Sequence, residues 1–504
     1  MPLAHRGSAP LHRPVRELIR HAPVTCSPAT TIAEAARLMQ AEAVGAVVVV
    51  DGDGAPIGIV TDRDLRGKVV AAELPPSEPV GRIMSAPLHV VSAGAPAIEA
   101  LLEMLRRGIR HLPVLEAPAP GGEPAGGVRD RLVGVVSSHD FLTPGEAHPV
   151  PLLRAIERQT RVDDLAALAP KVTAVIRALL DDGVPSADIA RITAELHDAL
   201  VRRLLGMAEQ ALAADGFGHP PVRYCWLALG SEGRREQTLS TDQDNALVHE
   251  RPPADVPAWA VDRYFERLAA ETVSGLVRCG VPRCPADVMA SNRTWRQPVD
   301  VWERRFSRWV RQSSPEDLLE ASIVFDFRPV WGAHDLADRL FAHLRKEVDA
   351  WKAFLRLMAW SAVSTAPPIG LFGRLVTPLW GPSRGKINLK LQGMLPLVNA
   401  LRVHALELAL RQTNTLERLE AAAARDGRFA PRQVEELTAA YEVITRLRLR
   451  RQLADLDAGR PPTSAVEPGA LNRAERAGLR EALLAVRRLQ NDLRTRFLTD
   501  MLFG

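Results

Sequence analysis

The sequence has 504 residues, of which 46% are hydrophobic and 25% are charged. This length exceeds what one hydrophobic core supports and indicates about three domains, and the composition is that of an ordinary globular protein. Lys and Arg (64) nearly balance Asp and Glu (60). Because no block of like charge forms, solvated helix faces are favoured over a nucleic-acid-binding groove.

The N-terminal residues and the cysteines indicate the cellular compartment. Residues 1–16 are rich in Pro, His and Arg and lack the apolar stretch of an export signal, and the most apolar short run, Ala46–Val50, has only the length of a strand. The four cysteines show no zinc-ligand spacing and are expected to be reduced thiols in the core. These features predict a cytoplasmic protein without a membrane segment.

Residues 15–142 contain one sequence unit twice, at about 15–70 and 79–142. Each unit joins a segment of helical period to segments of strand period, and the two units close on similar strings, Gly58-Ile59-Val60-Thr61-Asp62 and Gly134-Val135-Val136-Ser137-Ser138. A Gly- and Pro-rich insert at 117–127 predicts a mobile hairpin loop in the second unit.

The repeat resembles a tandem pair of CBS domains, also called a Bateman module. The resemblance implies an adenosyl ligand of the AMP, ADP or ATP type in the cleft between the copies, held by a hydroxyl side chain and by an aspartate on the ribose. By position these residues are Thr61 and Asp62 in the first copy. In the second copy Ser137 keeps the hydroxyl but Ser138 replaces the aspartate, which implies at most one complete ribose site. The resemblance also implies a homodimer, and a pair used only for dimerisation is the alternative.

A helical connector is predicted at 152–215, after a Pro- and Gly-containing linker at 143–151. Its helical pattern breaks at Pro170 and at Gly183-Val184-Pro185-Ser186, where Ser186 is the expected N-cap of the next helix. These helices either transmit a change in the repeated units to the next domain or act as a passive spacer.

The next domain is predicted at 216–340 and mixes strands and helices. Its expected elements are, in order, a strand (221–229), a Gly-Ser turn, a strand (about 243–249), a helix (Val261–Arg278) and a strand (about 281–290). This alternation predicts a small mixed sheet with helices on one side.

Two short motifs in this domain suit nucleotide chemistry. Gly230 lets the backbone approach a phosphate, and Ser231 adds a hydroxyl donor beside the exposed N–H groups of a helical turn. Asp242 and Asp244 open the second strand, and their spacing of two places both carboxylates on one face, where they can hold Mg²⁺ against a triphosphate. Metal-assisted nucleotidyl transfer needs little more than positioning and charge neutralisation.

In this order and spacing the motifs resemble the nucleotidyltransferase signature of the DNA polymerase β superfamily. The string is most similar to the putative nucleotidyltransferase family that is often fused to CBS domains, and to the N-terminal domain of protein-PII uridylyltransferases. The resemblance implies a polymerase-β-type α+β core, an NTP substrate and Mg²⁺ or Mn²⁺ held by Asp242 and Asp244. Arg234, in the turn, is a candidate phosphate contact because of its charge, with a solvated arginine as the alternative.

The superfamily usually places a third carboxylate on the last strand. Asp287 is the candidate in that segment, and a surface turn is the alternative. Asp326, flanked by phenylalanines, is a second candidate, although this setting favours a buried partner for an arginine such as Arg328. Without a third carboxylate the two-metal site is incomplete.

Residues 345–500 are predicted to form a helical bundle, with helices at 351–365, 387–424, 430–456 and 470–498. Through Ile387–Pro396 and Asn414–Leu419 this region resembles the substrate-binding helical domain that follows the same catalytic family. Lys386 and Lys390 are expected on one helix face, turned either toward a triphosphate, with Lys390 as a nucleotide contact, or toward solvent.

The sequence thus predicts a multidomain α/β and α protein with two competing functions. The first is an Mg²⁺-dependent nucleotidyltransferase that moves an NMP group from an NTP to a protein or small-molecule hydroxyl, by analogy the tyrosine of a signalling protein, under control of adenine nucleotide at the CBS pair. The second is a non-catalytic nucleotide sensor in signal transduction that acts through a partner or its oligomeric state. Modification of an aminoglycoside-type small molecule is a third option, suggested only by the domain layout.

Overall fold

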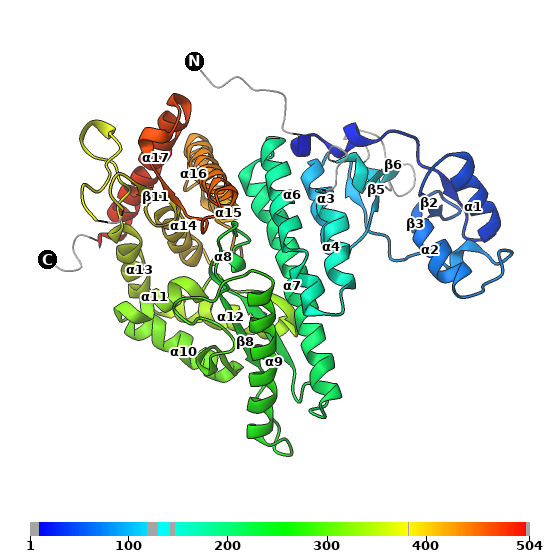
Figure 1. Ribbon diagram of the computed structural model, residues 1–504, viewed down its shortest axis with the longest axis horizontal. Coiled ribbons are helices and arrows are strands. Elements are labelled where there is room, and N and C mark those ends of the chain that lie inside the picture. Colours follow the sequence, from blue (N-terminus) through cyan, green and yellow to red (C-terminus); the bar gives the residue numbers. More distant parts are fainter. Residues whose placement is uncertain (1–9, 118–129, 142–146, 382, 500–504) are drawn as a thin grey trace. The chain divides into compact units, whose positions relative to one another are not determined.

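The computed structural model describes residues 10–117, 130–141, 147–381 and 383–499, so the loop predicted at 117–127 lies outside the described residues except for its first one. The chain divides into two compact units, residues 1–154 and 155–504 (Figure 1). Among the described residues no helix is both long and apolar enough to cross a bilayer. All four cysteines are buried and free.

The first unit contains two similar three-stranded sheets, each with an amphipathic helix. The first copy contains β1 (Thr25–Cys26), α1 (Ile32–Ala41), β2 (Ala46–Val50), β3 (Pro56–Thr61) and α2 (Asp62–Asp64). The second copy contains β4 (Val91–Ser92), α3 (Ala97–Arg107), β5 (His111–Glu116) and β6 (Arg131–Ser137). In each sheet the middle strand pairs parallel with the strand before it and antiparallel with the strand after it. The two predicted units therefore share one topology.

Connector helices open the second unit. They are the end of α4 (Pro149–Arg158), α5 (Val162–Ala166), α6 (Ala169–Asp181) and the long α7 (Ser186–Ala214). Ser186 is the first residue of α7 rather than its N-cap, and its N–H and hydroxyl donate to the Glu442 carboxylate, at 2.6 and 3.2 Å. A carboxylate from another helix thus replaces the expected local cap.

A four-stranded mixed sheet forms the core, in the order β10-β7-β8-β9. Its strands are β7 (Tyr224–Ala228), β8 (Asn245–His249), β9 (Arg296–Pro298) and β10 (Arg328–Gly332). The strand predicted at 281–290 is wrong: apart from one bridge, Gln243 to Arg283, this segment is a loop. Its two prolines, Pro282 and Pro285, cannot donate to a ladder. The strand that pairs in parallel with β8 is β9 instead.

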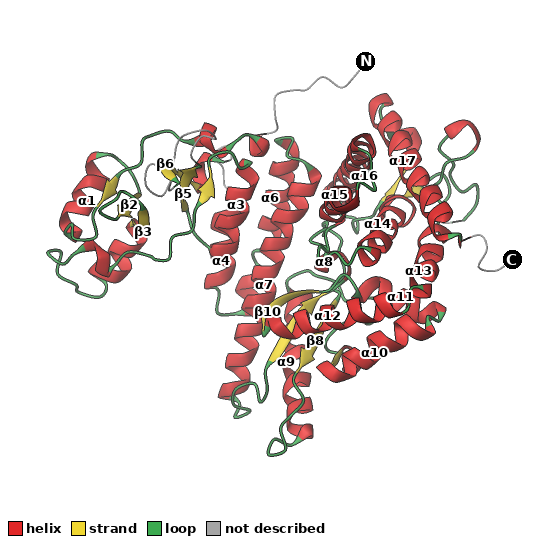
Figure 2. Cartoon of the chain, turned by 180° about the vertical axis from the view of Figure 1, so that it is seen from behind, coloured by secondary structure: helices red, strands yellow, loops and turns green. Residues whose placement is uncertain are grey.

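Helices cover both faces of this sheet rather than one (Figure 2). On one face the Tyr224 ring packs against Phe265 of α9 (Ala258–Arg278), with centroids 5.1 Å apart. On the other, Trp302 of α10 (Val299–Gln312) donates its indole N–H to the Leu247 carbonyl, and α12 (His334–Ala350) packs on β7, β8 and β10. Every residue of β7 and β8 is buried, which is the pattern of strands covered on both sides.

The C-terminal region is a bundle of helices. Beyond α11 (Pro315–Val324) it contains α13 (Ala353–Ser364), α14 (Leu395–Glu407), α15 (Thr415–Asp426), α16 (Pro431–Asp457) and α17 (Arg473–Phe497), with a two-stranded ladder of β11 (Ile387–Asn388) and β12 (Ala465–Val466). The single helix predicted at 387–424 is wrong, because the segment begins as β11 and breaks between α14 and α15. Lys386 therefore precedes a strand and lies 3.7 Å from Glu467 instead of sharing a helix face with Lys390.

Candidate active site

The turn after β7, residues 230–233, forms the short helix α8 and requires glycine at two positions. Gly230 has a φ of +52°, and a Cβ there would lie 2.6 Å from Oδ2 of Asp244. A Cβ on Gly233 would lie 1.9 Å from the backbone oxygen of Asp326. The glycines thus let this Gly-Ser turn lie directly against Asp244 on one side and Asp326 on the other.

Asp242 and Asp244 immediately precede β8, beside the Gly-Ser turn. The Leu229 N–H donates to the Asp244 carbonyl at 2.9 Å, which fixes this placement. Burial raises the pKa of Asp244, a hydrogen bond from the Cys284 thiol and the Lys390 charge oppose that rise, and the Asp242 charge adds to it. Two carboxylates that repel one another at low exposure are a donor set that suits a hard divalent cation such as Mg²⁺.

The predicted third carboxylate does not join this pair. Asp287 is exposed, has a φ of +54°, and accepts a hydrogen bond from the Asn292 amide at 2.8 Å. The residue of its loop that reaches Asp244 is Cys284. Among the described residues no group of three or more His, Cys, Asp or Glu side chains is arranged to hold a metal ion.

Asp326 is a structural anchor rather than a metal ligand. Its carboxylate is fully buried and binds the guanidinium groups of Arg234, Arg402 and Arg418 at 2.6–2.9 Å. These charges hold the pKa of Asp326 far below its usual range, despite burial. Arg328 is not its partner, because it turns to α7 and pairs with Asp198 at 2.7 Å. The expected role for Asp326 fits the structure, but with other arginines.

A cavity of about 140 Å³ lies between the Gly-Ser turn and the C-terminal helices. Ser231 and Arg234 line it from the turn, and Lys390 and Arg448 line it from the C-terminal region. Three of the four predicted nucleotide contacts thus share one cavity, and the fourth, Gly230, is next to Ser231. Arg234, however, is held by Glu236 and Asp326 at 2.8 and 2.6 Å, so it positions the turn in addition to lining the cavity.

Arg448 was not singled out from the sequence, where it is one of several arginines on a long helix. It is 7% exposed, and burial lowers its pKa to about 10. Its guanidinium donates to the hydroxyls of Thr238 and Ser464 at 3.4 and 3.3 Å, and within the described ranges it has no carboxylate partner. No carboxylate forms a direct ion pair with this buried cation, although the Glu236 charge stabilises it, and it lines a cavity that Lys390 also lines. Such a site favours an anionic ligand.

The loop before α15 docks on the Gly-Ser turn. The Thr413 hydroxyl donates to the Gly233 carbonyl at 2.7 Å, and the Asn414 amide donates to the Arg234 carbonyl at 3.0 Å. The Thr415 N–H donates to the Glu236 carboxylate at 2.6 Å. The C-terminal bundle thus holds the backbone of the turn as well as closing the cavity.

The predicted residues of the repeated units lie at the ends of β3 and β6. Thr61 donates from its N–H and hydroxyl to Asp64 at 2.9 and 2.7 Å, and Ser137 does the same to Asp140 at 2.7 and 2.8 Å. The two copies therefore share a hydroxyl-x-x-Asp motif. The motif is present in the sequence, but it was not among the predicted features. At most one complete ribose site was expected because Ser138 replaces the aspartate of the first copy. Since both copies carry the motif, this reason is weakened.

Asp62 is exposed and lies between the copies. A Cβ on Gly45 would meet both Asp62 Oδ2, at 3.4 Å, and His111 Nε2 of the second copy, at 3.0 Å. Burial lowers the pKa of His111, and the Asp62 charge opposes that shift. The space beside Asp62 is thus bordered by residues of both copies.

Family models match most of the chain. A CBS domain matches residues 15–71 and again 80–143, the putative nucleotidyltransferase DUF294 matches 170–316, and a putative nucleotidyltransferase substrate binding domain matches 352–497. The predicted resemblance and fold class are therefore confirmed.

Individual relatives cover smaller parts. An uncharacterized protein of Methanopyrus kandleri is 36% identical over 129 residues, 25% of this chain and 60% of that protein. The inosine-5'-monophosphate dehydrogenase of Mycobacterium tuberculosis is 34% identical over 188 residues, 36% of this chain and 31% of the enzyme. The chain thus spans less than two thirds of either relative.

Solved structures also match part of the chain. A CBS domain protein from Pyrobaculum aerophilum complexed with AMP is 29% identical and covers 28% of this chain and 100% of that one, with a TM-score of 0.23. A putative signal-transduction protein with CBS domains from Burkholderia ambifaria is 30% identical and covers 26% of this chain and 90% of that one, with a TM-score of 0.22. By these family models the chain belongs to the DUF294 putative nucleotidyltransferases, with a CBS pair before the nucleotidyltransferase domain and the family's substrate binding domain after it.

Proposed function

We propose that the protein transfers an NMP group from an NTP to a hydroxyl of a protein or small molecule. The observation that carries the proposal is the cavity at the Gly-Ser turn, where Lys390 and Arg448 supply positive charge beside Ser231 and where Asp242 and Asp244 adjoin. A triphosphate matches the charge of such a cavity, and the adjoining carboxylates match a cation bound to that triphosphate.

Each residue has a role that follows from its place. Ser231 offers its hydroxyl and the turn offers backbone N–H groups to phosphate oxygens, while Lys390 and Arg448 neutralise the triphosphate from the opposite wall. Asp242 and Asp244 would hold Mg²⁺ or Mn²⁺, which when bound polarises the phosphoryl oxygens. The acceptor oxygen forms a bond to the α-phosphorus, the bond to pyrophosphate breaks, and the hydroxyl proton passes to solvent. Arg234 positions the turn through Asp326.

The proposal also concerns the acceptor. The resemblance of the core to protein-PII uridylyltransferases supports a hydroxyl such as a tyrosine side chain in a signalling protein. The substrate binding domain at 352–497 closes the same cavity through Lys390 and Arg448, which supports an acceptor site near that domain.

Incubation of the protein with each α-labelled NTP, Mg²⁺ and a cell lysate tests the proposal. We expect label on an acceptor and release of pyrophosphate, both abolished by Asp242→Asn/Asp244→Asn. Asp287→Asn is a matched comparison: because Asp287 is exposed and bonded to Asn292, it should leave labelling unchanged. Equal labelling by the wild type and the double variant would refute the proposal.

We further propose that adenine nucleotides of the AMP, ADP or ATP type bind between the CBS copies and adjust this activity. Support comes from the family match and from Thr61, Asp62 and Ser137, which lie at the strand ends of the two copies. Association of two chains through their CBS pairs is the expected assembly.

A non-catalytic nucleotide sensor is the second candidate. The observation that favours it is that Asp244 meets a thiol, Cys284, where a third carboxylate was expected. The sensor would bind NTP at the same cavity without turnover. Titration calorimetry combined with a pyrophosphate assay separates the two, because binding without pyrophosphate release in the presence of the lysate would support the sensor.

A further inference from the structure

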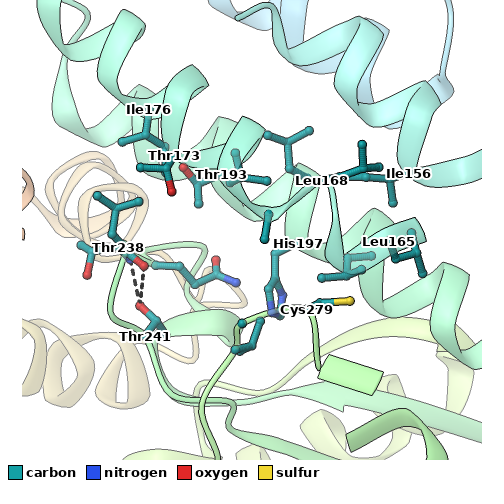
Figure 3. A pocket seen from close by; sticks show the side chains of 18 of the residues that line it. Ile156, Leu165, Leu168, Thr173, Ile176, Thr193, His197, Thr238, Thr241 and Cys279 are labelled. Carbon is teal, nitrogen blue, oxygen red and sulfur yellow. Dashed lines mark hydrogen bonds between the residues drawn. The ribbon is translucent and has the colours of Figure 1, made fainter. Parts of the chain in front are cut away.

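A second cavity, of about 180 Å³, lies behind the Gly-Ser turn, between the connector helices and the core. Figure 3 shows Leu165 of α5, Leu168 between α5 and α6, and Ile176 of α6 on one side, with Thr238 and Thr241 of the core on the other. Most of the lining is aliphatic. This cavity has no part in the function proposed above.

Three polar side chains of the lining, Glu232, Gln237 and His197, carry atoms without a hydrogen-bond partner among the described residues. Glu232 and Gln237 are 2% and 4% exposed. Four of their atoms, Glu232 Oε1, His197 Nε2 and both amide atoms of Gln237, have no hydrogen-bond partner among the described residues. Glu232 Oε1 and His197 Nε2 lie 3.6 Å apart, beyond hydrogen-bond length. Buried polar groups that remain unpaired cost free energy, so this cluster points to a ligand that pairs with them.

The lining also disfavours an anionic ligand. None of the residues around this cavity, all of them within the described ranges, is Lys or Arg, whereas the cavity at the Gly-Ser turn has three such cations. Burial lowers the pKa of His197 to about 4, so its imidazole is neutral near pH 7. A phosphate or carboxylate would therefore find no counter-charge here.

We infer that this cavity binds a small neutral molecule with a compact hydrocarbon body and one hydroxyl group, held at the hydroxyl by Gln237 and His197. The volume agrees with this class, since apolar protein cavities of about 150 Å³ accept benzene. The Gln237 amide supplies both a donor and an acceptor, which matches the two capacities of a hydroxyl.

The position of the cavity gives the ligand a route to the nucleotide. Thr241 lines both cavities, and the segment from Gln237 to Thr241 leads directly to Asp242. Within this segment the Thr241 hydroxyl accepts from the Thr238 N–H at 2.8 Å (Figure 3). An effect of the ligand on turnover follows only if the proposed function holds, whereas binding itself does not depend on it.

Phenol and toluene test the inference, because they have the same number of heavy atoms and differ only in the hydroxyl. Their affinities for the full-length protein are measured by ligand-observed NMR, without NTP. We expect phenol to bind about tenfold more tightly than toluene, the factor expected from a net hydrogen bond. Equal affinities for the two would overturn the inference.

Three variants locate the binding. Gln237→Leu removes two of the unpaired atoms, so it should bring the phenol-to-toluene ratio near one without lowering the Tm of the free protein. Ala169→Leu projects into the cavity and should weaken both probes at least tenfold, while Ala174→Leu, at an exposed position of the same helix, should not. Wild-type binding by both Gln237→Leu and Ala169→Leu would overturn the inference, and the first variant decides alone if the second fails to fold.

Discussion

Asp326 of the nucleotidyltransferase domain and Arg402 of the C-terminal bundle form a fully buried ion pair, with Oδ2 and Nη2 2.6 Å apart. The same carboxylate binds Arg234 of the Gly-Ser turn and Arg418 of α15. One acidic group therefore joins the turn, the core and two C-terminal helices. The substrate binding domain is in this way fixed to the part of the core that carries Ser231.

Removal of this carboxylate should destabilise the second unit strongly. Asp326→Ala leaves three buried guanidinium groups without their shared counter-charge, and we expect a loss of about 3–5 kcal/mol or more in the free energy of unfolding. Urea denaturation followed by tryptophan fluorescence measures it, because all nine tryptophans lie between Trp226 and Trp380. Glu303→Ala, which breaks a partly exposed pair with Arg339, should cost less than about 1 kcal/mol. Similar losses for the two variants would contradict the prediction.

Local features of the candidate site could be predicted from the sequence. Gly230, Ser231, Asp242 and Asp244 lie within fifteen residues of one another on a strand, a turn and a second strand. Period and turn chemistry determine such an arrangement, and the structure has the turn and the two aspartates side by side. The hydroxyl-x-x-Asp motif of the CBS copies is equally local, but its aspartate lies three residues beyond the hydroxyl, whereas the prediction considered only the next residue, Asp62 or Ser138.

The rest depends on packing between distant segments. The path of a proline-containing loop decides whether Cys284 or Asp287 reaches Asp244. This path cannot be predicted from the periodicity of the sequence. Arg448 becomes distinctive only through its burial against Thr238, more than two hundred residues earlier. Asp326 was correctly expected to bind arginine, but which arginine depends on how α14 and α15 dock.

Lys390 should contribute to triphosphate binding. It is exposed, lines the cavity at the Gly-Ser turn, and its charge reaches Asp244. Lys390→Met should weaken ATP binding in the presence of Mg²⁺ about tenfold, the effect of losing a charge-assisted hydrogen bond, and leave adenosine binding unchanged. Lys386→Met is the control, because Lys386 lies beside Glu467 instead. An equal effect of both variants would show that only general surface charge matters.

Arg448 should matter for ligand binding more than for folding. Because its buried cation forms no direct ion pair with a carboxylate in the described part of the chain and bonds only to hydroxyls, Arg448→Leu should leave the Tm of the free protein unchanged or higher. The rise in Tm that inorganic triphosphate causes in the wild type should be lost in the variant. Thermal unfolding with and without triphosphate measures both effects. A lower Tm combined with an intact triphosphate response would make Arg448 a structural residue.

Asp62 should bind the ribose of an adenine nucleotide. Its carboxylate is exposed between the CBS copies, whereas the Asp64 carboxylate is occupied by Thr61 and by Lys68 at 2.8 Å. Asp62→Ala should weaken AMP binding about tenfold, as expected for lost hydrogen bonds to a charged acceptor. Calorimetry on the full chain measures the affinity. Unchanged binding in Asp62→Ala, with binding abolished in Asp64→Ala, would assign the ribose to Asp64.

His197 should make the second unit less stable in mild acid. Its pKa is lowered by burial to about 4 in the folded protein, against about 6.5 in an unfolded chain. Between these values the unfolded state binds one more proton, so stability falls as the pH falls from 6.5 to 4 and levels off below. From pH 7.5 to 5 this site should account for about 2 kcal/mol of the loss.

His197→Gln removes this contribution and provides the measurement. The loss of unfolding free energy between pH 7.5 and 5 should be about 2 kcal/mol smaller in the variant than in the wild type. His404, whose pKa burial also lowers to about 4, is present in both proteins and cancels in the comparison. The same pH dependence in both proteins would mean that the Glu232 carboxylate, 3.6 Å away, stabilises the His197 imidazolium. In that case the lining of the cavity would carry charge at His197 and Glu232, and a neutral ligand would no longer be the class that it fits.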